Sequence, residues 1–145
     1  MPTHKECKTL TYSTEHLFNI VLDVAKYPEF LPWLSNACVY GQKEGEFLAA
    51  LTIGYKIISE TYTSKVCYVK DQYVNAECIK GPFKWLKTQW HFKTMPENMC
   101  VVEFSIDYEF SNFIFEKLLS SFFHEASTKI LSAFEERAFT TSKSF

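Results

Sequence analysis

The sequence lacks several features that mark out whole classes of protein. No apolar run reaches the roughly 18 residues that a membrane-spanning helix requires. The first residues have neither the apolar core of a secretory signal nor an arginine-rich transit character, so we expect neither secretion nor import. The net charge is only −2, which argues against a disordered chain and against a dedicated nucleic-acid binder.

Motifs for metal, phosphate and nucleophilic chemistry are also missing. The five cysteines are widely spaced and form no Cys-x-x-Cys pair, which disfavours a zinc site or a redox motif. No two of the four histidines lie three or four residues apart, as a metal-binding pair on a helix would require. The four glycines form no phosphate-binding loop, and no Gly-x-Ser-x-Gly sequence is present. We therefore predict a binding protein rather than an enzyme, with no catalytic and no metal-binding residues.

Aromatic side chains, by contrast, are abundant. They make up 17% of the chain, with 14 Phe, 8 Tyr and 3 Trp, which is more ring surface than a small core needs. Hydrophobic residues reach 47%, an ordinary fraction for a globular protein. The 145 residues correspond to about one domain, and we predict a single lipid-binding domain over 1–145 with its core at about 5–140.

The order of the expected elements indicates an α+β fold. A first strand is expected at 5–12, a helix capped by Ser13 or Thr14 at 15–24, and a second short helix at 27–34. Further strands are expected at 37–42, 46–55, 57–70, 73–79, 83–94 and 100–110. A long helix then runs to about residue 139, with apolar positions three or four residues apart. These positions are Phe115, Leu118, Leu119, Phe122, Phe123, Ala126, Ile130, Leu131, Phe134 and Ala138.

A curved antiparallel sheet wrapped around a long C-terminal helix fits this order. In the last strand, Val102, Phe104, Ile106, Tyr108 and Phe110 alternate with polar residues and should face the helix. The intervening acidic side chains should lie in solvent, and they are Glu103, Asp107 and Glu109. Phe83 and Trp85 differ in parity from Trp90 and Phe92, which predicts a bulge between these two pairs.

Two prolines bracket a second distinctive segment. Tyr27, Phe30 and Trp33 are spaced to share one face of a one-turn helix, with Pro28 near its start and Pro32 near its end. One interpretation is a small cap packed on the edge of the sheet. The other is a lid over the mouth of a pocket, whose rings could rest in a membrane interface.

A sheet that wraps a helix tends to leave an apolar space between them, which is a typical setting for a ligand. We expect an elongated cavity of at least roughly 300 Å³. The residues predicted to bind a ligand are Tyr27, Phe30, Pro32, Trp33, Leu51, Ile53, Trp90, Phe104, Phe122, Ala126 and Ile130.

Several segments together resemble a known family. The most specific is 27–33, which has the pattern Tyr-Pro-x-Phe-x-Pro-Trp. Other matching segments lie at 20–24, 50–55, 60–64, 81–83, 90–92, 102–110 and 133–138. Over about residues 5–140 the chain is similar to the coenzyme Q-binding START-like family, part of the polyketide cyclase and lipid transport superfamily.

This resemblance implies a helix-grip fold, START-like or Bet v 1-like, with a hydrophobic cavity between the sheet and the C-terminal helix. It also implies that the cavity holds ubiquinone or a related isoprenoid lipid, with no covalent cofactor. The implied role is that of a carrier or chaperone supporting respiratory electron transport, not that of a catalyst. One departure is Leu34, where the family usually has Cys, which puts a thiol-dependent role at that position in doubt.

Two other functions stay open at this point. Bacterial relatives with similar sequences act as toxin-like factors that bind the large ribosomal subunit and block subunit association, which would require a basic face. That face would be built from Lys56, Lys65, Lys70, Lys80, Lys84, Lys87 and Lys93. The second alternative, a polyketide cyclase or aromatase, would require convergent polar groups inside the pocket.

The expected partners are a lipid ligand and, transiently, a membrane surface, with the large ribosomal subunit as an alternative and no DNA. We expect a bacterial cytoplasmic protein that is peripheral to the inner membrane. A processed eukaryotic protein would instead lie on the matrix side of the mitochondrial inner membrane.

Overall fold

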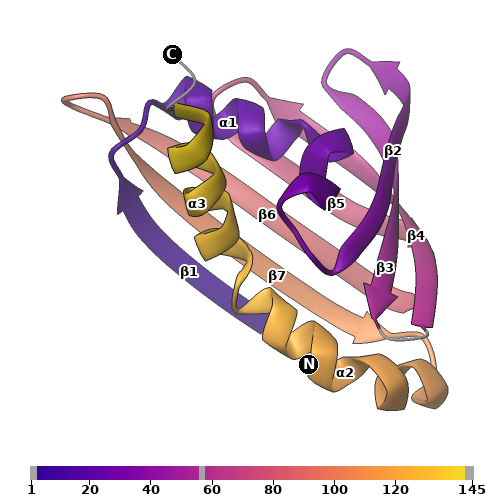
Figure 1. Cartoon of the computed structure of the whole chain (residues 1–145). Coiled ribbons are helices and arrows are strands. Elements are labelled where there is room, and N and C mark those ends of the chain that lie inside the picture. Colours follow the sequence, from indigo (N-terminus) through magenta and orange to yellow (C-terminus); the bar gives the residue numbers. More distant parts are fainter. Residues whose placement is uncertain (1–2, 56–57, 143–145) are drawn as a thin grey trace.

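Seven strands form one antiparallel sheet in this computed structural model, which describes residues 3–55 and 58–142 (Figure 1). The strands are β1 (Thr3–Leu10), β2 (Leu34–Lys43), β3 (Glu46–Tyr55), β4 (Ile58–Val69), β5 (Tyr73–Lys80), β6 (Phe83–Met95) and β7 (Met99–Phe110). Their order across the sheet is β1-β7-β6-β5-β4-β3-β2. Strands β2 to β7 therefore follow one another as a meander, and β1 completes the sheet beside β7.

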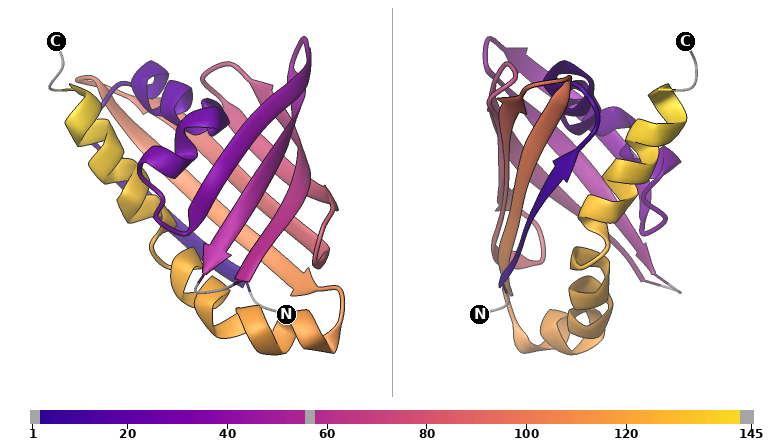
Figure 2. Two further views of the ribbon diagram at one scale, coloured as in Figure 1. Left: turned by 45° about the vertical axis from the view of Figure 1, so that its right-hand side comes forward. Right: turned by 90° about the vertical axis from the view of Figure 1, so that its left-hand side faces the viewer.

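The helices all lie on the concave side of the curved sheet (Figure 2). Helix α1 (Thr14–Leu22) and the 3₁₀ helix η1 (Val24–Glu29) connect β1 to β2, the two edges of the sheet. Helices α2 (Phe113–Ser127) and α3 (Ile130–Ser142) follow β7. This arrangement confirms the α+β, helix-grip fold. None of the helices in the described ranges is long and apolar enough to cross a membrane.

Helix α1 begins where its capping residue predicts. The Ser13 hydroxyl accepts a hydrogen bond from the backbone N–H of His16 at 3.1 Å, satisfying one of the free donors of the first turn. Phe18 on its buried face contacts the rings of Phe92 at 5.9 Å and Tyr68 at 6.3 Å. Helix α1 thereby closes one end of the space between the sheet and the helices.

The second short helix differs from its prediction. It covers Val24–Glu29 rather than 27–34, with Pro28 inside it, Phe30 as its C-cap residue and Trp33 in a turn before β2. The expected face shared by three rings of one helix is therefore wrong. A 3₁₀ helix is rarely long, and Pro32 disfavours the helical conformation at the residue before it.

The expected long C-terminal helix is broken into α2 and α3 (Figures 1 and 2). At the break, the Ser127 hydroxyl donates to the carbonyl of Phe123 at 2.8 Å and the Thr128 hydroxyl donates to that of Glu125 at 2.7 Å. The backbone N–H of Thr128 also donates to Glu125, at 3.2 Å, so the last turn of α2 tightens to a 3₁₀-type bond. Hydroxyl groups that bond back to carbonyls in this way favour the bending of a helix.

Helix α2 meets the sheet with one side only. Leu119, Phe123 and Ala126 are buried, whereas Leu118, expected on the same buried face, is 53% exposed. Phe113 is exposed as well, at 73%. In Figure 1 the start of α2 extends past the end of the sheet, so the first part of this helix has little sheet beneath it.

Strand β7 confirms its predicted alternation, since its residues from Val102 to Phe110 at even numbers are all buried, while Glu103 is exposed. Asp107 and Glu109 on the same face are partly exposed. Strand β6 does contain a bulge, but it lies between Phe83 and Trp85 and not between that pair and Trp90 and Phe92, as predicted.

Candidate functional site

A largely apolar cavity of about 100 Å³ lies between the sheet and its helices. Strands β2 to β7 line it on one side, and residues of η1, the loop after η1, α2 and α3 close it from the other side. Its volume is smaller than the predicted 300 Å³, so that expectation is wrong for this closed conformation. Tyr27, Phe123 and Phe134 are the aromatic residues of the described helices that line the cavity.

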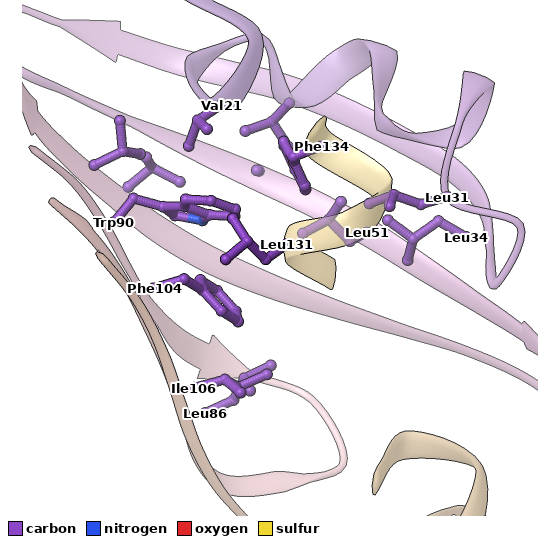
Figure 3. Close-up of a cluster of buried hydrophobic side chains, with 14 of the residues drawn as sticks. Val21, Leu31, Leu34, Leu51, Leu86, Trp90, Phe104, Ile106, Leu131 and Phe134 are labelled. Atoms are coloured by element: carbon purple, nitrogen blue, oxygen red, sulfur yellow. The ribbon is translucent and has the colours of Figure 1, made fainter. Parts of the chain in front are cut away.

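Three aromatic rings in tilted contact form one wall of the cavity. Trp90 on β6 lies between Phe104 on β7 and Phe134 on α3, with ring centroids 4.5 Å and 4.7 Å away (Figure 3). Phe134 in turn meets Tyr27 edge-on at 5.2 Å. Phe134 on α3 thus contacts both the sheet and η1.

Most of the predicted ligand-binding residues line this cavity. They are Tyr27, Trp33, Leu51, Ile53, Trp90, Phe104, Ala126 and Ile130. The structure brings these residues together around one cavity, while their binding of a ligand stays a prediction.

The other three predicted residues lie elsewhere. Phe30 packs edge-on against Phe134 at 5.0 Å and lies under the guanidinium of Arg137, also at 5.0 Å, in a groove between α1 and α3. Pro32 is exposed, and Phe122 is half-buried against the core. Of the three rings expected to form a lid, only Tyr27 and Trp33 reach the cavity.

The sequence interpretation missed several lining residues. Leu34, the departure from the family's usual Cys, is 7% exposed and faces the cavity, so this position adds an apolar wall. Val66 and Val74 on β4 and β5 also line it. The two-residue period of a strand could have identified Val66, because it puts Val66 on the same face of β4 as Tyr62 and Ser64.

Two of the cavity's polar groups are already paired within the protein. The Tyr27 hydroxyl donates to the backbone carbonyl of Val21, and the Ser127 hydroxyl donates to that of Phe123 at 2.8 Å. Burial raises the pKa of Tyr27 far above its usual range, and the nearby Tyr62 raises it further. Tyr27 therefore stays neutral at physiological pH.

Strand β4 contributes two more hydroxyls, Tyr62 and Ser64. Burial raises the pKa of Tyr62 well above its usual range, so this side chain is a neutral donor too. Gly81 packs directly against Tyr62, where an added Cβ would lie 2.5 Å from the Cβ of Tyr62. A glycine at this position leaves room for the tyrosine, whose ring also meets Phe83 edge-on at 5.5 Å.

Charged groups are absent from the cavity lining in the described part of the chain, which contains no Asp, Glu, Lys, Arg or His. Within those same residues, no cluster of His, Cys, Asp and Glu could hold a metal ion. The site can therefore surround an apolar body and offer neutral hydroxyls to it, but its lining provides no carboxylate or imidazole for general acid–base chemistry.

The lysines considered for ribosome binding form a mixed surface. Lys56 lies outside the described residues, and the other six named above are exposed. Several lie beside carboxylates: Lys65 is 3.8 Å from Glu46, Lys84 is 3.6 Å from Glu109, and Lys87 pairs in register with both Glu77 and Asp107. These carboxylates reduce the positive potential that phosphate binding would require.

Comparison with known proteins identifies a family for this chain. A family model described as polyketide cyclase / dehydrase and lipid transport matches residues 10–135. A "Ribosome association toxin RatA" from Vibrio cholerae is 34% identical over 129 residues, covering 89% of this chain and 90% of that protein. The mitochondrial "Coenzyme Q-binding protein COQ10 homolog B" from Xenopus laevis is 32% identical over 139 residues, covering 93% of this chain and 57% of that protein.

Solved structures agree on the fold. A START superfamily protein from Mycobacterium smegmatis has a TM-score of 0.79 at 14% identity, covering 96% of this chain and 98% of that one. An 18 kDa protein from Caulobacter crescentus has a TM-score of 0.75 at 28% identity, with 99% of both chains covered. The names of the two sequence relatives describe association with the ribosome and binding of coenzyme Q.

Proposed function

Because the chain belongs to the polyketide cyclase / dehydrase and lipid transport family, we propose that it binds a hydrophobic ligand in the cavity and carries it. The ligand we propose is ubiquinone or a related isoprenoid lipid, delivered in support of respiratory electron transport. The similarity to a protein named for coenzyme Q binding supports this choice.

The observation that carries the proposal is the uncharged, largely apolar lining. Ligand sites are typically apolar with a few polar groups that orient the bound molecule, and this cavity matches that description. An isoprenoid tail gains about 25 cal/mol for each Å² of apolar surface that it buries. Such a wall can therefore hold a lipid without charged contacts.

The closed cavity has to open before a lipid enters. Ligand pockets usually measure about 300–1,000 Å³, and the volume here is about 100 Å³. Helix α2 is the wall best suited to move, because it exposes Phe113, Ile114 and Leu118 and ends at the break beside Ser127. Its displacement would widen the cavity while leaving the hydrogen bonds of the sheet intact.

Transient contact with a membrane surface is part of this proposal, because a water-insoluble lipid has to be taken up from a bilayer and returned to it. We place the protein in the cytoplasm of a bacterium, at the inner membrane, or on the matrix side in a mitochondrion. Lipid extraction from the purified protein, followed by mass spectrometry, tests the proposal. Recovery of a stoichiometric isoprenoid quinone would support it, whereas a protein that neither retains such a lipid nor takes it up from vesicles would refute it.

A second function is favoured by the relatives named as ribosome association toxins, which match the chain along 89% of its length. Under this proposal the chain would bind the large ribosomal subunit and inhibit its association with the small one. The mixed charge around Lys65, Lys84 and Lys87 does not favour it. Sucrose-gradient sedimentation with purified subunits distinguishes the two functions, since a carrier alone would leave the 70S fraction unchanged.

A further inference from the structure

Two hydroxyl groups on β4 point into the cavity without a partner. Ser64 is 3% exposed and Tyr62 lies two residues before it, on the same face of the strand. Within residues 3–55 and 58–142, neither side chain makes a hydrogen bond, unlike Tyr27 and Ser127 in the same cavity.

A hydroxyl without a hydrogen-bond partner is unusual at a position whose side chain only packs in an apolar core. The hydroxyl oxygens of Tyr62 and Ser64 are not among the described side-chain atoms that are fully buried without a partner, so both are open to the cavity. A hydrogen bond that the protein leaves unmade can be made there by a bound molecule. The next residue on this face of β4 is Val66, which is apolar and also lines the cavity, so this face of the strand accommodates apolar side chains as well. The hydroxyls of Tyr62 and Ser64 are therefore donors available to a bound molecule.

We propose that Tyr62 and Ser64 form a hydrogen-bonding pole of the cavity, which selects a neutral lipid carrying an oxygen acceptor, such as a quinone or ester carbonyl. This inference rests on the proposed function. The pole would place the carbonyl-bearing head group against β4 and leave the rest of the molecule to the apolar walls. A fatty acid carboxylate would be rejected, because the described lining holds no cation to neutralise its buried charge.

Binding of three probes tests the inference: a decyl-substituted benzoquinone, decylbenzene and decanoate. The variants are Tyr62→Phe and Ser64→Ala, each of which removes a hydroxyl with little change of shape. Tyr68→Phe is the matched control, since Tyr68 lies on the same strand, packs against Phe18 and Phe47, and does not line the cavity.

We expect each cavity variant to bind the quinone about three- to tenfold more weakly, the effect of one lost hydrogen bond, and to bind decylbenzene unchanged. Decanoate should bind the wild type far more weakly than the quinone does. The control should resemble the wild type with every probe. Ser64→Ala should also leave the melting temperature of the ligand-free protein unlowered, because the hydroxyl has no partner to lose.

The outcomes separate this inference from the function on which it rests. Equal quinone affinity in wild type and both cavity variants would overturn the pole while leaving the carrier in place. Decanoate binding as tight as quinone binding would overturn the selectivity, and a lower melting temperature for Ser64→Ala would show that its hydroxyl is already paired. A wild-type protein that binds neither the quinone nor decylbenzene would refute the carrier itself.

Discussion

Filling the cavity should stabilise the protein and abolish ligand binding at once. Ala126 on α2 is 6% exposed and lines the cavity, so Ala126→Leu directs a larger side chain into the empty space. The substitution adds three carbon atoms, and at about 0.8 kcal/mol per buried CH₂ the ligand-free protein gains at most about 2 kcal/mol. For a chain of this size that corresponds to a rise in melting temperature of about 4–8 °C.

The assay combines differential scanning calorimetry of the delipidated protein with quantification of the quinone that it takes up from vesicles. Ser121→Leu is the control, since it adds a leucine to an exposed position of the same helix. We expect Ala126→Leu to melt higher and take up little quinone, and the control to behave as the wild type. A lower melting temperature would show that the cavity is not free space, and normal uptake would show that the ligand binds elsewhere.

Three further perturbations test other parts of the structure. Trp33→Ala should reduce quinone retention and membrane contact. Because Trp33 is half-buried, this substitution should lower the free energy of unfolding by less than the roughly 3–5 kcal/mol that truncation of a fully buried Trp costs. A larger loss of stability with normal quinone content would make Trp33 a core residue. Burial raises the folded-state pKa of Tyr27 and Tyr62, so the stability that their neutral forms contribute should be constant below about pH 10 and fall above it. Urea titrations at a series of pH values would measure this loss of stability, and the loss should be smaller in Tyr62→Phe. Asn112→Ala removes the side chain that accepts from the N–H of Phe115, and should lower unfolding free energy by about 1 kcal/mol in chemical denaturation without lowering quinone affinity.

Local pattern was sufficient for the parts of the fold that depend on neighbouring residues. The two-residue alternation of β7 identified which face of the strand is buried, because successive side chains of a strand point to opposite sides wherever the strand lies. Ser13 predicted the start of α1 for a similar reason, since a capping bond reaches only three residues along the chain. The abundance of rings also indicated aromatic walls, and Trp90 and Phe104 supply them.

Only the tertiary structure decided the form of the candidate site. An apolar repeat continues through the region of Thr128, so periodicity alone predicted one helix, while the structure has two, with hydroxyl hydrogen bonds to carbonyls at the break. The buried face of α2 is formed by Leu119, Phe123 and Ala126, so Leu118 is exposed and Phe122 does not line the cavity. The cavity's volume is the small difference between the space under the sheet and the side chains that fill it. That difference depends on how Phe134 and its neighbours pack together, which no single segment of the sequence determines.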